Sequence, residues 1–184
     1  MASLFGHAVA SVALGKALTT QKMSPNFWML TVYCSLLPDG DVIAFYFNIP
    51  YGHLLGHRGL SHSILFAAVL GFSVAYFFFR DLGRFTPRWW RYAFYFFLVV
   101  IAHSFSDAIS NGGLGVAWFA PFSNHRYFLP WRPLEVSPIG GLTYFFGEAG
   151  WRVIKSEFVW IWLPSIALVL ASYGVRKLRA KTRS

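Results

Sequence analysis

Residues 54–79 read LLGHRGLSHSILFAAVLGFSVAYFFF. The part from Leu60 to Phe79 is apolar and long enough to cross a bilayer, because a membrane helix needs about 20 mostly apolar residues. His57, Arg58 and His62 stand at the entrance to this run. Ionisable side chains beside a membrane helix are costly and usually functional. The stretch therefore predicts both a membrane helix and a polar site at its start.

The composition extends this prediction to the whole chain of 184 residues, of which 56% are hydrophobic and 12% charged. A soluble domain carries about twice that charged fraction. The apolar residues form five blocks: Leu4–Leu18, Asn26–Leu37, Leu60–Phe79, Trp90–Ile109 and Phe158–Tyr173. We expect one all-α domain over residues 1–184, a polytopic membrane bundle of about four to five helices. The first two blocks are short, which leaves open whether they span fully.

The basic residues predict how the bundle lies in the membrane. The net charge is +9, from 16 Lys and Arg against 7 Asp and Glu. If every block crosses, one side holds Lys16, Lys22, Arg80, Arg84, Arg88, Arg91, Arg176, Lys177, Arg179, Lys181 and Arg183, and the other holds Arg58, Arg126, Arg132, Arg152 and Lys155. The positive-inside rule then places the C-terminus in the cytoplasm of a multi-pass inner membrane protein. Topology explains the positive charge, so nucleic acid is not an expected partner.

The connection 110–157 contains NGGLGVAWFAPFSNHRYFLPWRPLEVSPIGG over residues 111–141. Its five Gly and four Pro break regular helices. We expect an irregular cap, rich in Gly, Pro and aromatic residues, on the outer side of the bundle. The aromatic residues of this cap are of the kind that collects at membrane interfaces.

Polar residues that do not suit a membrane span all fall on this outer side: His7, Asp39, Asp41, His57, Arg58, His62, His103 and Asp107. The four-residue spacing of His103 and Asp107 places both on one face of a helix. Imidazole and carboxylate are ligands that suit Zn²⁺ or Mn²⁺. The alternatives are a buried ion pair for these two residues and a solvated turn for the PDGD segment.

The opening stretch can bring two histidines into that site. His57 and His62 are five residues apart, which would set them on different faces of one continuous helix. Gly59 permits a break, and Ser61 is a suitable N-cap for the following helix. We therefore expect His57 in a loop and His62 in the first helical turn, both pointing inward. His53 is a weaker candidate, because it lies in a Gly-flanked loop.

Four motifs occur in an order that resembles the YdjM-like family, which is described as LexA-regulated, membrane-bound, metal-dependent hydrolases. They are FGHAVASVALG, SLLPDGDV, HRGLSHS and HSFSDAISNGG, within residues 4–133. The resemblance implies a helical membrane protein whose metal centre is built from His7, Asp39, His57, His62, His103 and Asp107. A more distant likeness is to the zinc phospholipase C and P1-nuclease group. The chain lacks the later H-x-x-x-E of that group, so we expect one or two ions rather than three.

These observations predict a metal-dependent phosphoester hydrolase that acts on a lipid or another amphiphile at the membrane interface. The ion is expected to be zinc, with manganese or magnesium as alternatives, and to activate water. Asp39 or Asp41 would act as general base. Arg58 would clamp phosphate or serve as an interfacial anchor, and His125 and Arg126 would bind the substrate. Membrane lipids and this amphiphilic substrate are the expected partners, with no obligate protein partner.

Two other classes of protein remain open at this point. A divalent-metal transporter would place its site near the membrane midplane, whereas the candidate ligands gather at one end of the helices. A non-catalytic protein that binds metal or haem is the second alternative. Haem iron takes axial His, Met or Cys ligands, so carboxylates beside the histidines favour a harder metal ion.

Overall fold

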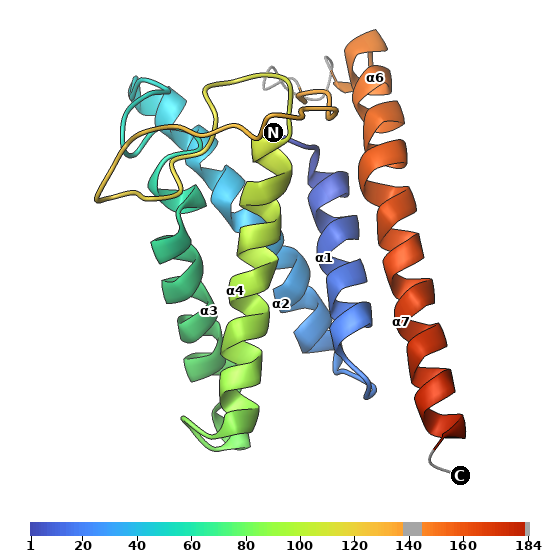
Figure 1. The fold of residues 1–184 in the computed structure, drawn as a ribbon. Coiled ribbons are helices and arrows are strands. Elements are labelled where there is room, and N and C mark those ends of the chain that lie inside the picture. The colour runs from blue at the N-terminus through green and yellow to red at the C-terminus, as the bar shows by residue number, and fades with distance from the viewer. Residues whose placement is uncertain (138–144, 183–184) are drawn as a thin grey trace.

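The computed structural model describes residues 1–137 and 145–182, and within them every extended regular element is helical. The helices are α1 (Leu4–Leu18), α2 (Pro25–Leu36), α3 (Ile64–Phe78), α4 (Pro87–Ala108), α6 (Glu148–Glu157) and α7 (Leu163–Lys181). A π-helical turn, η4 (Phe158–Trp162), joins α6 to α7. Figure 1 shows these helices side by side, with the long connections gathered at one end. The all-α prediction is confirmed.

Short polar residues begin four of the helices. Ser3, Ser24, Ser63 and Thr86 each accept a hydrogen bond from the backbone N–H three residues later, at the start of α1, α2, α3 and α4. Such N-caps satisfy one of the backbone donors that a helix leaves free at its start. Pro25 and Pro87 occupy the first position of their helices, where proline needs no N–H partner.

Helix α4 forms the centre of the bundle and packs most extensively against α3. The core between α2, α3 and α4 includes Phe27, Phe96, Val99 and Val100, all nearly or fully buried. Gly71 on α3 allows the closest approach, since a Cβ atom there would lie 2.6 Å from the Ala93 carbonyl oxygen. Small residues permit such close contact between helix backbones in membrane bundles.

Three 3₁₀ segments connect or extend the helices: η1 (Leu37–Phe47), η2 (Leu60–His62) and η3 (Arg80–Leu82). We use "site end" for the end of the bundle that carries η1, η2 and residues 109–137, and "basic end" for the end that carries residues 19–24, 79–86 and the end of α7. The helices α1, α2, α3 and α4 and the long helix α6–η4–α7 each run from one end to the other, so the two ends are built from different parts of the sequence (Figure 1).

Two details of the sequence prediction are wrong. The N-cap of α3 is Ser63 rather than Ser61, which places His62 in η2 and not in the first turn of the helix. The irregular cap ends before residue 157, because α6 begins at Glu148. Gly147 is the N-cap of that helix, and the breakers that justified the cap lie upstream of it. Residues 138–144 of the cap lie outside the described residues.

Helix length identifies one membrane-spanning candidate among the described residues. The rod formed by α6, η4 and α7, Glu148–Lys181, has 34 residues and a mean hydropathy of 1.8 in an apolar 18-residue window. Only 6% of that window is buried against the rest of the chain. Helices α1 and α3 are apolar but have 15 residues each. At 1.5 Å per residue each is about 22 Å long, short of a bilayer core of about 30 Å.

Candidate metal centre

Five segments deliver the predicted metal ligands to the site end. His7 comes from the second turn of α1, Asp39 from the start of η1, and His57 from the loop before η2. His62 ends η2, and His103 and Asp107 lie one turn apart at the end of α4. The side chains of all six are buried, with residue exposures from 0 to 4%. The structure therefore brings together every residue of the predicted ligand set.

The loop that carries His57 depends on Gly59. A Cβ atom there would lie 2.1 Å from the carbonyl oxygen of Leu54, so no larger residue fits. The chain folds back at this point, and Leu60 N–H donates to the same carbonyl at 2.8 Å. The predicted break is thus present, and it places His57 and His62 with their rings 5.6 Å apart.

Ligand atoms in this cluster are spaced like the ligands of a metal ion. His7 Nε2 lies 3.6 Å from an Asp39 oxygen and 3.5 Å from an Asp107 oxygen. His103 Nε2 lies 3.5 Å from Asp39 and 3.0 Å from His62 Nε2. Two ligands on a tetrahedral zinc ion, with bonds of about 2.0–2.1 Å, are about 3.3 Å apart. The observed separations therefore match the edges of such a coordination shell.

The groups that contact Nδ1 of each histidine determine which ring nitrogen carries the proton. His103 Nδ1 contacts the Ser35 carbonyl oxygen at 2.7 Å, so it must donate. His57 Nδ1 contacts the Asp41 carboxylate at 2.5 Å and must donate as well. His62 Nδ1 faces the other oxygen of Asp41 at 3.1 Å. A neutral imidazole with a proton on Nδ1 keeps a free electron pair on Nε2.

His7 follows the same rule through a serine. Its Nδ1 lies 3.2 Å from Ser106 Oγ, and that hydroxyl donates its own hydrogen to the His103 carbonyl at 2.7 Å. Ser106 can therefore only accept from His7, which leaves His7 Nε2 with the electron pair. All four Nε2 atoms thus face the centre as electron-pair donors, an arrangement that is typical of metal-binding histidines.

Several atoms of the cluster have no hydrogen-bond partner among the described residues. They are His7 Nε2, His57 Nε2 and both carboxylate oxygens of Asp39. Buried polar atoms in proteins nearly always have a partner. A cation bound by these atoms would satisfy them together, so the donor set fits a divalent ion. The ligand atoms form two overlapping groups, His7–Asp39–His103–Asp107 and Asp39–His57–His62, that share Asp39.

The charges of the cluster also favour a bound cation. Burial would raise the pKa of the Asp39 carboxyl, but neighbouring His103, His62 and His7 lower it below its usual range. Burial would lower the pKa of His62, but contacts with Asp107, Asp39 and Asp41 raise it well above its usual range. Both shifts arise because carboxylates surround the imidazoles and attract positive charge. A proton or a divalent cation can supply that charge.

Asp41 does not point into the cluster. One of its oxygens accepts from His57, and the other accepts from the Arg58 backbone N–H at 3.0 Å and from Ser61 Oγ at 2.5 Å. Burial would raise the pKa of this carboxyl, but His57 and His62 lower it below its usual range. The structure thus places Asp41 behind two candidate ligands, where it fixes their orientation.

Arg58 is fully buried, and its guanidinium is held on three sides. Nε donates to Asp107 Oδ2 at 3.1 Å, one terminal nitrogen donates to the Gly112 carbonyl at 2.9 Å, and the other donates to Ser110 Oγ at 2.9 Å. The contacts tie the loop at residue 58 to the end of α4. They also hold Asp107 Oδ2, the oxygen that lies 3.4 Å from His62 Nε2.

Arg126 and His125 occupy different environments in the cap. The guanidinium of Arg126 donates to the backbone carbonyls of His57, Tyr51 and His53 at 2.7 to 3.0 Å. It therefore supports the loop that carries His57. His125 is exposed and packs edge-on against Tyr127. His53 is exposed too, and its Nδ1 accepts from the Leu55 backbone, so it is not part of the cluster.

Sequence reasoning missed the residues that support the ligands. Ser106 and Ser61 sit inside the HSFSD and HRGLSHS motifs, and their proximity to ligands was the available signal. Glu157 was missed as well. It is fully buried in the long rod and accepts hydrogen bonds from Ser3 N–H and, at 2.7 Å, from Ser3 Oγ. The available signal was a single acid before an apolar run. Glu157 attaches the segment that precedes His7 to the rod.

Comparison with known proteins agrees with the motif resemblance. The chain matches the model of the YdjM inner membrane protein family over residues 1–180. It is also similar to the inner membrane protein YbcI of Escherichia coli (strain K12), with 34% identity over 174 residues, which cover 92% of this chain and 95% of that protein. No solved structure matches the chain. The predicted family is confirmed, and this chain belongs to the YdjM family of inner membrane proteins.

Proposed function

We propose that this membrane protein is a metal-dependent hydrolase that cleaves a phosphoester of a lipid or another amphiphile at the outward-facing surface of the inner membrane. The observation that carries the proposal is the gathering of four histidines and two carboxylates in one buried cluster. His7 Nε2, His57 Nε2 and both Asp39 oxygens have no other described partner there. Mixed imidazole and carboxylate ligands are common where metal ions activate water.

Two ions, with Asp39 shared between them, account for all six ligands. His7, His103 and Asp107 would hold the first ion, and His57 and His62 the second, in line with the two groups of close ligand atoms. A divalent ion in such a site lowers the pKa of a bound water toward about 7 and so provides hydroxide at neutral pH. Zinc fits this ligand set, and manganese or magnesium are alternatives.

The other polar residues act on these ligands in the proposed mechanism. Asp41 accepts from both His57 and His62 and so keeps their Nε2 electron pairs directed inward. Arg58 neutralises and orients Asp107. The guanidinium is buried and already bonded to protein groups. A role in positioning Asp107 therefore explains its contacts better than a direct clamp on phosphate does.

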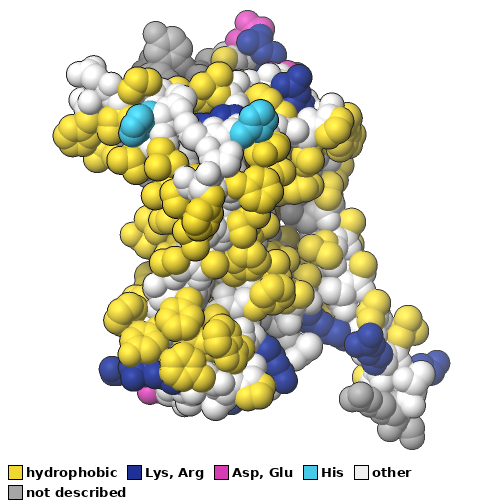
Figure 2. Space-filling model, turned by 60° about the vertical axis from the view of Figure 1, so that its left-hand side comes forward, with side chains coloured by type: hydrophobic (Ala, Val, Ile, Leu, Met, Phe, Trp, Pro, Cys, Tyr) yellow, Lys and Arg dark blue, Asp and Glu magenta, His cyan; other side chains and the backbone are white. Residues whose placement is uncertain are grey.

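The surface supports a membrane position for the whole bundle. Figure 2 shows hydrophobic side chains over the waist of the molecule, with basic side chains at both its upper and lower ends. Exposed aromatic residues surround the site end, among them Tyr46 (85%), Phe47 (70%), Phe122 (86%) and Trp131 (58%). Aromatic residues of this kind collect at the lipid headgroup level. We propose that all the helices are embedded, and that a lipid substrate reaches the site from this level.

A second candidate function is a non-catalytic metal-binding membrane protein. The complete burial of His57, His62 and Asp107 favours it, because substrate must reach a catalytic ion. Structural zinc sites are closed by protein ligands, whereas catalytic sites keep an open position. The two functions therefore differ in whether the loaded protein turns over any substrate.

Hydrolysis assays on the purified, metal-loaded chain test the proposal. Phospholipid vesicles and isoprenyl phosphates in detergent are offered as substrates, and phosphate or headgroup release is measured. We expect activity that a chelator abolishes and that added zinc or manganese restores. His57→Ala should be inactive, while Arg152→Ala, which alters an exposed ion pair with Glu148, should keep full activity. A metal-loaded protein that leaves every phosphoester intact supports the second candidate.

A further inference from the structure

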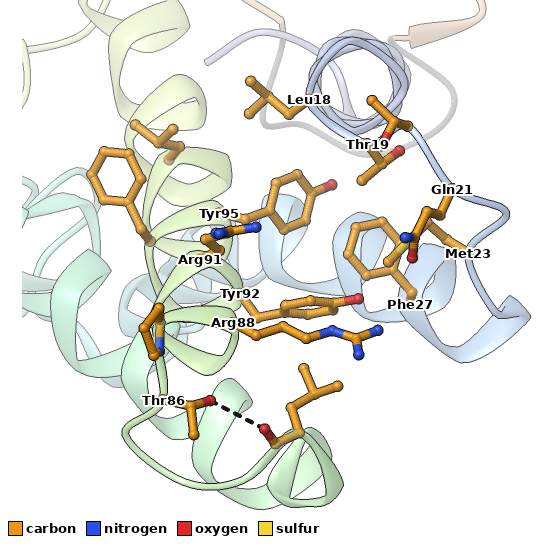
Figure 3. A pocket seen from close by; sticks show the side chains of 15 residues that line it. Leu18, Thr19, Gln21, Met23, Phe27, Thr86, Arg88, Arg91, Tyr92 and Tyr95 are labelled. Atoms are coloured by element: carbon orange, nitrogen blue, oxygen red, sulfur yellow. Dashed lines mark hydrogen bonds between the residues drawn. The ribbon is translucent and has the colours of Figure 1, made fainter.

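A groove of about 860 Å³ lies at the basic end, on the opposite side of the bundle from the metal centre. Figure 3 shows it between α4 and the connection that joins α1 to α2. Residues of the α1–α2 connection, of η3 and of the first half of α4 line it, among them Leu18, Arg88, Arg91, Phe94 and Leu98. No part of this groove belongs to the proposed hydrolase site.

The groove has one apolar wall and one basic edge. Leu18, Phe94 and Leu98 are apolar, and each is at least partly exposed, so the surface they form can receive a hydrocarbon chain. Arg88 and Arg91 stand on the first two turns of α4 and extend toward the α1–α2 connection (Figure 3). A ligand for this groove therefore needs an apolar part and an anionic part.

The two arginines have no internal counter-charge. Within residues 1–137 and 145–182, neither Arg88 nor Arg91 forms an ion pair, and none of the residues lining the groove is acidic. Arg84, in the neighbouring connection, instead stacks on the Tyr76 ring at 4.3 Å. The first turn of α4 contains no acid either. Because the start of a helix carries partial positive charge, cations there are unfavourable unless an anion is close.

We propose that this groove binds an anionic phospholipid, with its phosphate between Arg88 and Arg91 and an acyl chain along the wall formed by Leu18, Phe94 and Leu98. The cytoplasmic leaflet is negatively charged, and basic pockets between membrane helices on that side recognise such headgroups. The eleven Lys and Arg residues that predict a cytoplasmic basic end place the groove at that leaflet. Bidentate guanidinium groups recognise phosphate with defined geometry.

Lipid titration of the purified full chain in a neutral detergent tests the proposal. Phosphatidylglycerol and phosphatidylcholine of equal chain length are added separately, and bound lipid is counted by native mass spectrometry. We expect a saturable phosphatidylglycerol site and at least about tenfold weaker binding of phosphatidylcholine, since each basic residue near an anionic headgroup contributes about fivefold. The readout is binding alone, so it is independent of whether the metal centre is catalytic.

Three variants separate the parts of the site. Arg88→Gln combined with Arg91→Gln should weaken phosphatidylglycerol binding at least about tenfold. Both side chains are exposed, so this variant should fold normally. Leu98→Trp should weaken binding without any change of charge, because it fills the apolar wall. Arg84→Gln is the matched control, since it removes a charge from the same end outside the groove, and it should bind as the unchanged protein does.

Several results would overturn the proposal. Equal binding of the two lipids would show that charge is not recognised, and unchanged binding in the double Arg88/Arg91 variant would exclude the arginines. An equal loss in Arg84→Gln would indicate general attraction to the basic end rather than a site. Competition by soluble glycerol phosphate at the same concentration as phosphatidylglycerol would show that a free phosphate, and not a lipid, is the ligand.

Discussion

The Nε2 atoms of His62 and His103 lie 3.0 Å apart although 41 residues separate them in sequence. The Nδ1 atom of each ring faces an acceptor, Asp41 for His62 and the Ser35 carbonyl for His103. Two electron pairs at this distance repel each other unless a positive charge lies between them. Asp39 and Asp107 are close to both rings and add negative charge. The pair therefore indicates a cation site and motivates the first prediction.

The first prediction concerns metal stoichiometry. We expect two divalent ions per chain in the purified protein, one in His57→Ala, and at most one, weakly held, in His103→Ala. The difference arises because His57 belongs to one group of close ligand atoms and His103 to the other. Elemental analysis after gel filtration measures the ratio. Unchanged metal content in both variants would contradict the centre, and a single ion in the unchanged protein that both variants lose would reduce it to one site.

The second prediction concerns Arg58. Its removal in Arg58→Ala leaves the fully buried Asp107 without its guanidinium partner. Breaking a buried ion pair in this way typically costs about 3–5 kcal/mol. We expect a lower unfolding temperature and weaker metal binding, and no rescue by Arg58→Lys, because one ammonium cannot reach the three acceptors together.

The control for this experiment is Arg152→Ala, which removes an arginine whose side chain is 59% exposed and paired with Glu148. Exposed pairs contribute little to stability, so its unfolding temperature should not change. If Arg58→Ala keeps its metal and stability but loses hydrolytic activity, Arg58 contacts the substrate, and the phosphate clamp expected from the sequence is correct.

The third prediction tests the contact between α3 and α4. A Cβ atom at Gly71 would lie 2.6 Å from both the Ala93 carbonyl oxygen and the Phe97 nitrogen, which are backbone atoms that cannot easily move. We expect Gly71→Ala to destabilise the bundle by about 1–3 kcal/mol. Gly174→Ala is the matched control, because nothing lies within 4 Å of that position. It should leave stability unchanged or raise it by up to about 1 kcal/mol. Equal unfolding temperatures would contradict the packing.

The fourth prediction is the orientation in the membrane. The eleven-to-five division of Lys and Arg predicts that the C-terminus is cytoplasmic and that the site end faces outward. A fluorescent reporter that matures only in the cytoplasm, fused after Ser184, should be bright. A phosphatase that is active only outside should be silent at the same position. The reverse result would place the metal centre on the cytoplasmic side and exclude an outer-leaflet substrate.

Most of the candidate ligands were predictable because they lie in short polar motifs between or at the ends of apolar blocks. His103 and Asp107 are one helical turn apart, and Gly59 is where the chain must break to turn His57 inward. These are local features that a sequence displays. His7 was visible only as a polar residue in the first apolar block, the resemblance assigned it to the metal centre, and the structure places it beside Asp39 and Asp107.

Long-range contacts were not predictable in the same way. Asp41 and Arg58 look alike as charged residues beside ligands, but only folding shows that Asp41 supports two histidines and that Arg58 is buried against Asp107. The start of α6 was also missed, since Gly and Pro near residue 140 concealed a helix that begins at Glu148. The contact of Glu157 with Ser3 joins residues 154 positions apart.

The last prediction uses Asp41→Asn to test the orientation of the histidines. The Asp41 carboxylate accepts from His57 on one oxygen and from Ser61, His62 and the Arg58 backbone on the other. The single amide oxygen of asparagine best serves the side with three donors, so its NH₂ group faces His57 Nδ1. That group can only donate, and His57 must then carry its proton on Nε2, where it no longer binds metal. We expect Asp41→Asn to weaken the ion at His57 by about 10–100-fold and to resemble His57→Ala in metal content. A variant that instead loses the ion held by His7 and His103, or keeps both ions at full affinity, would show that Asp41 does not set the proton position of His57.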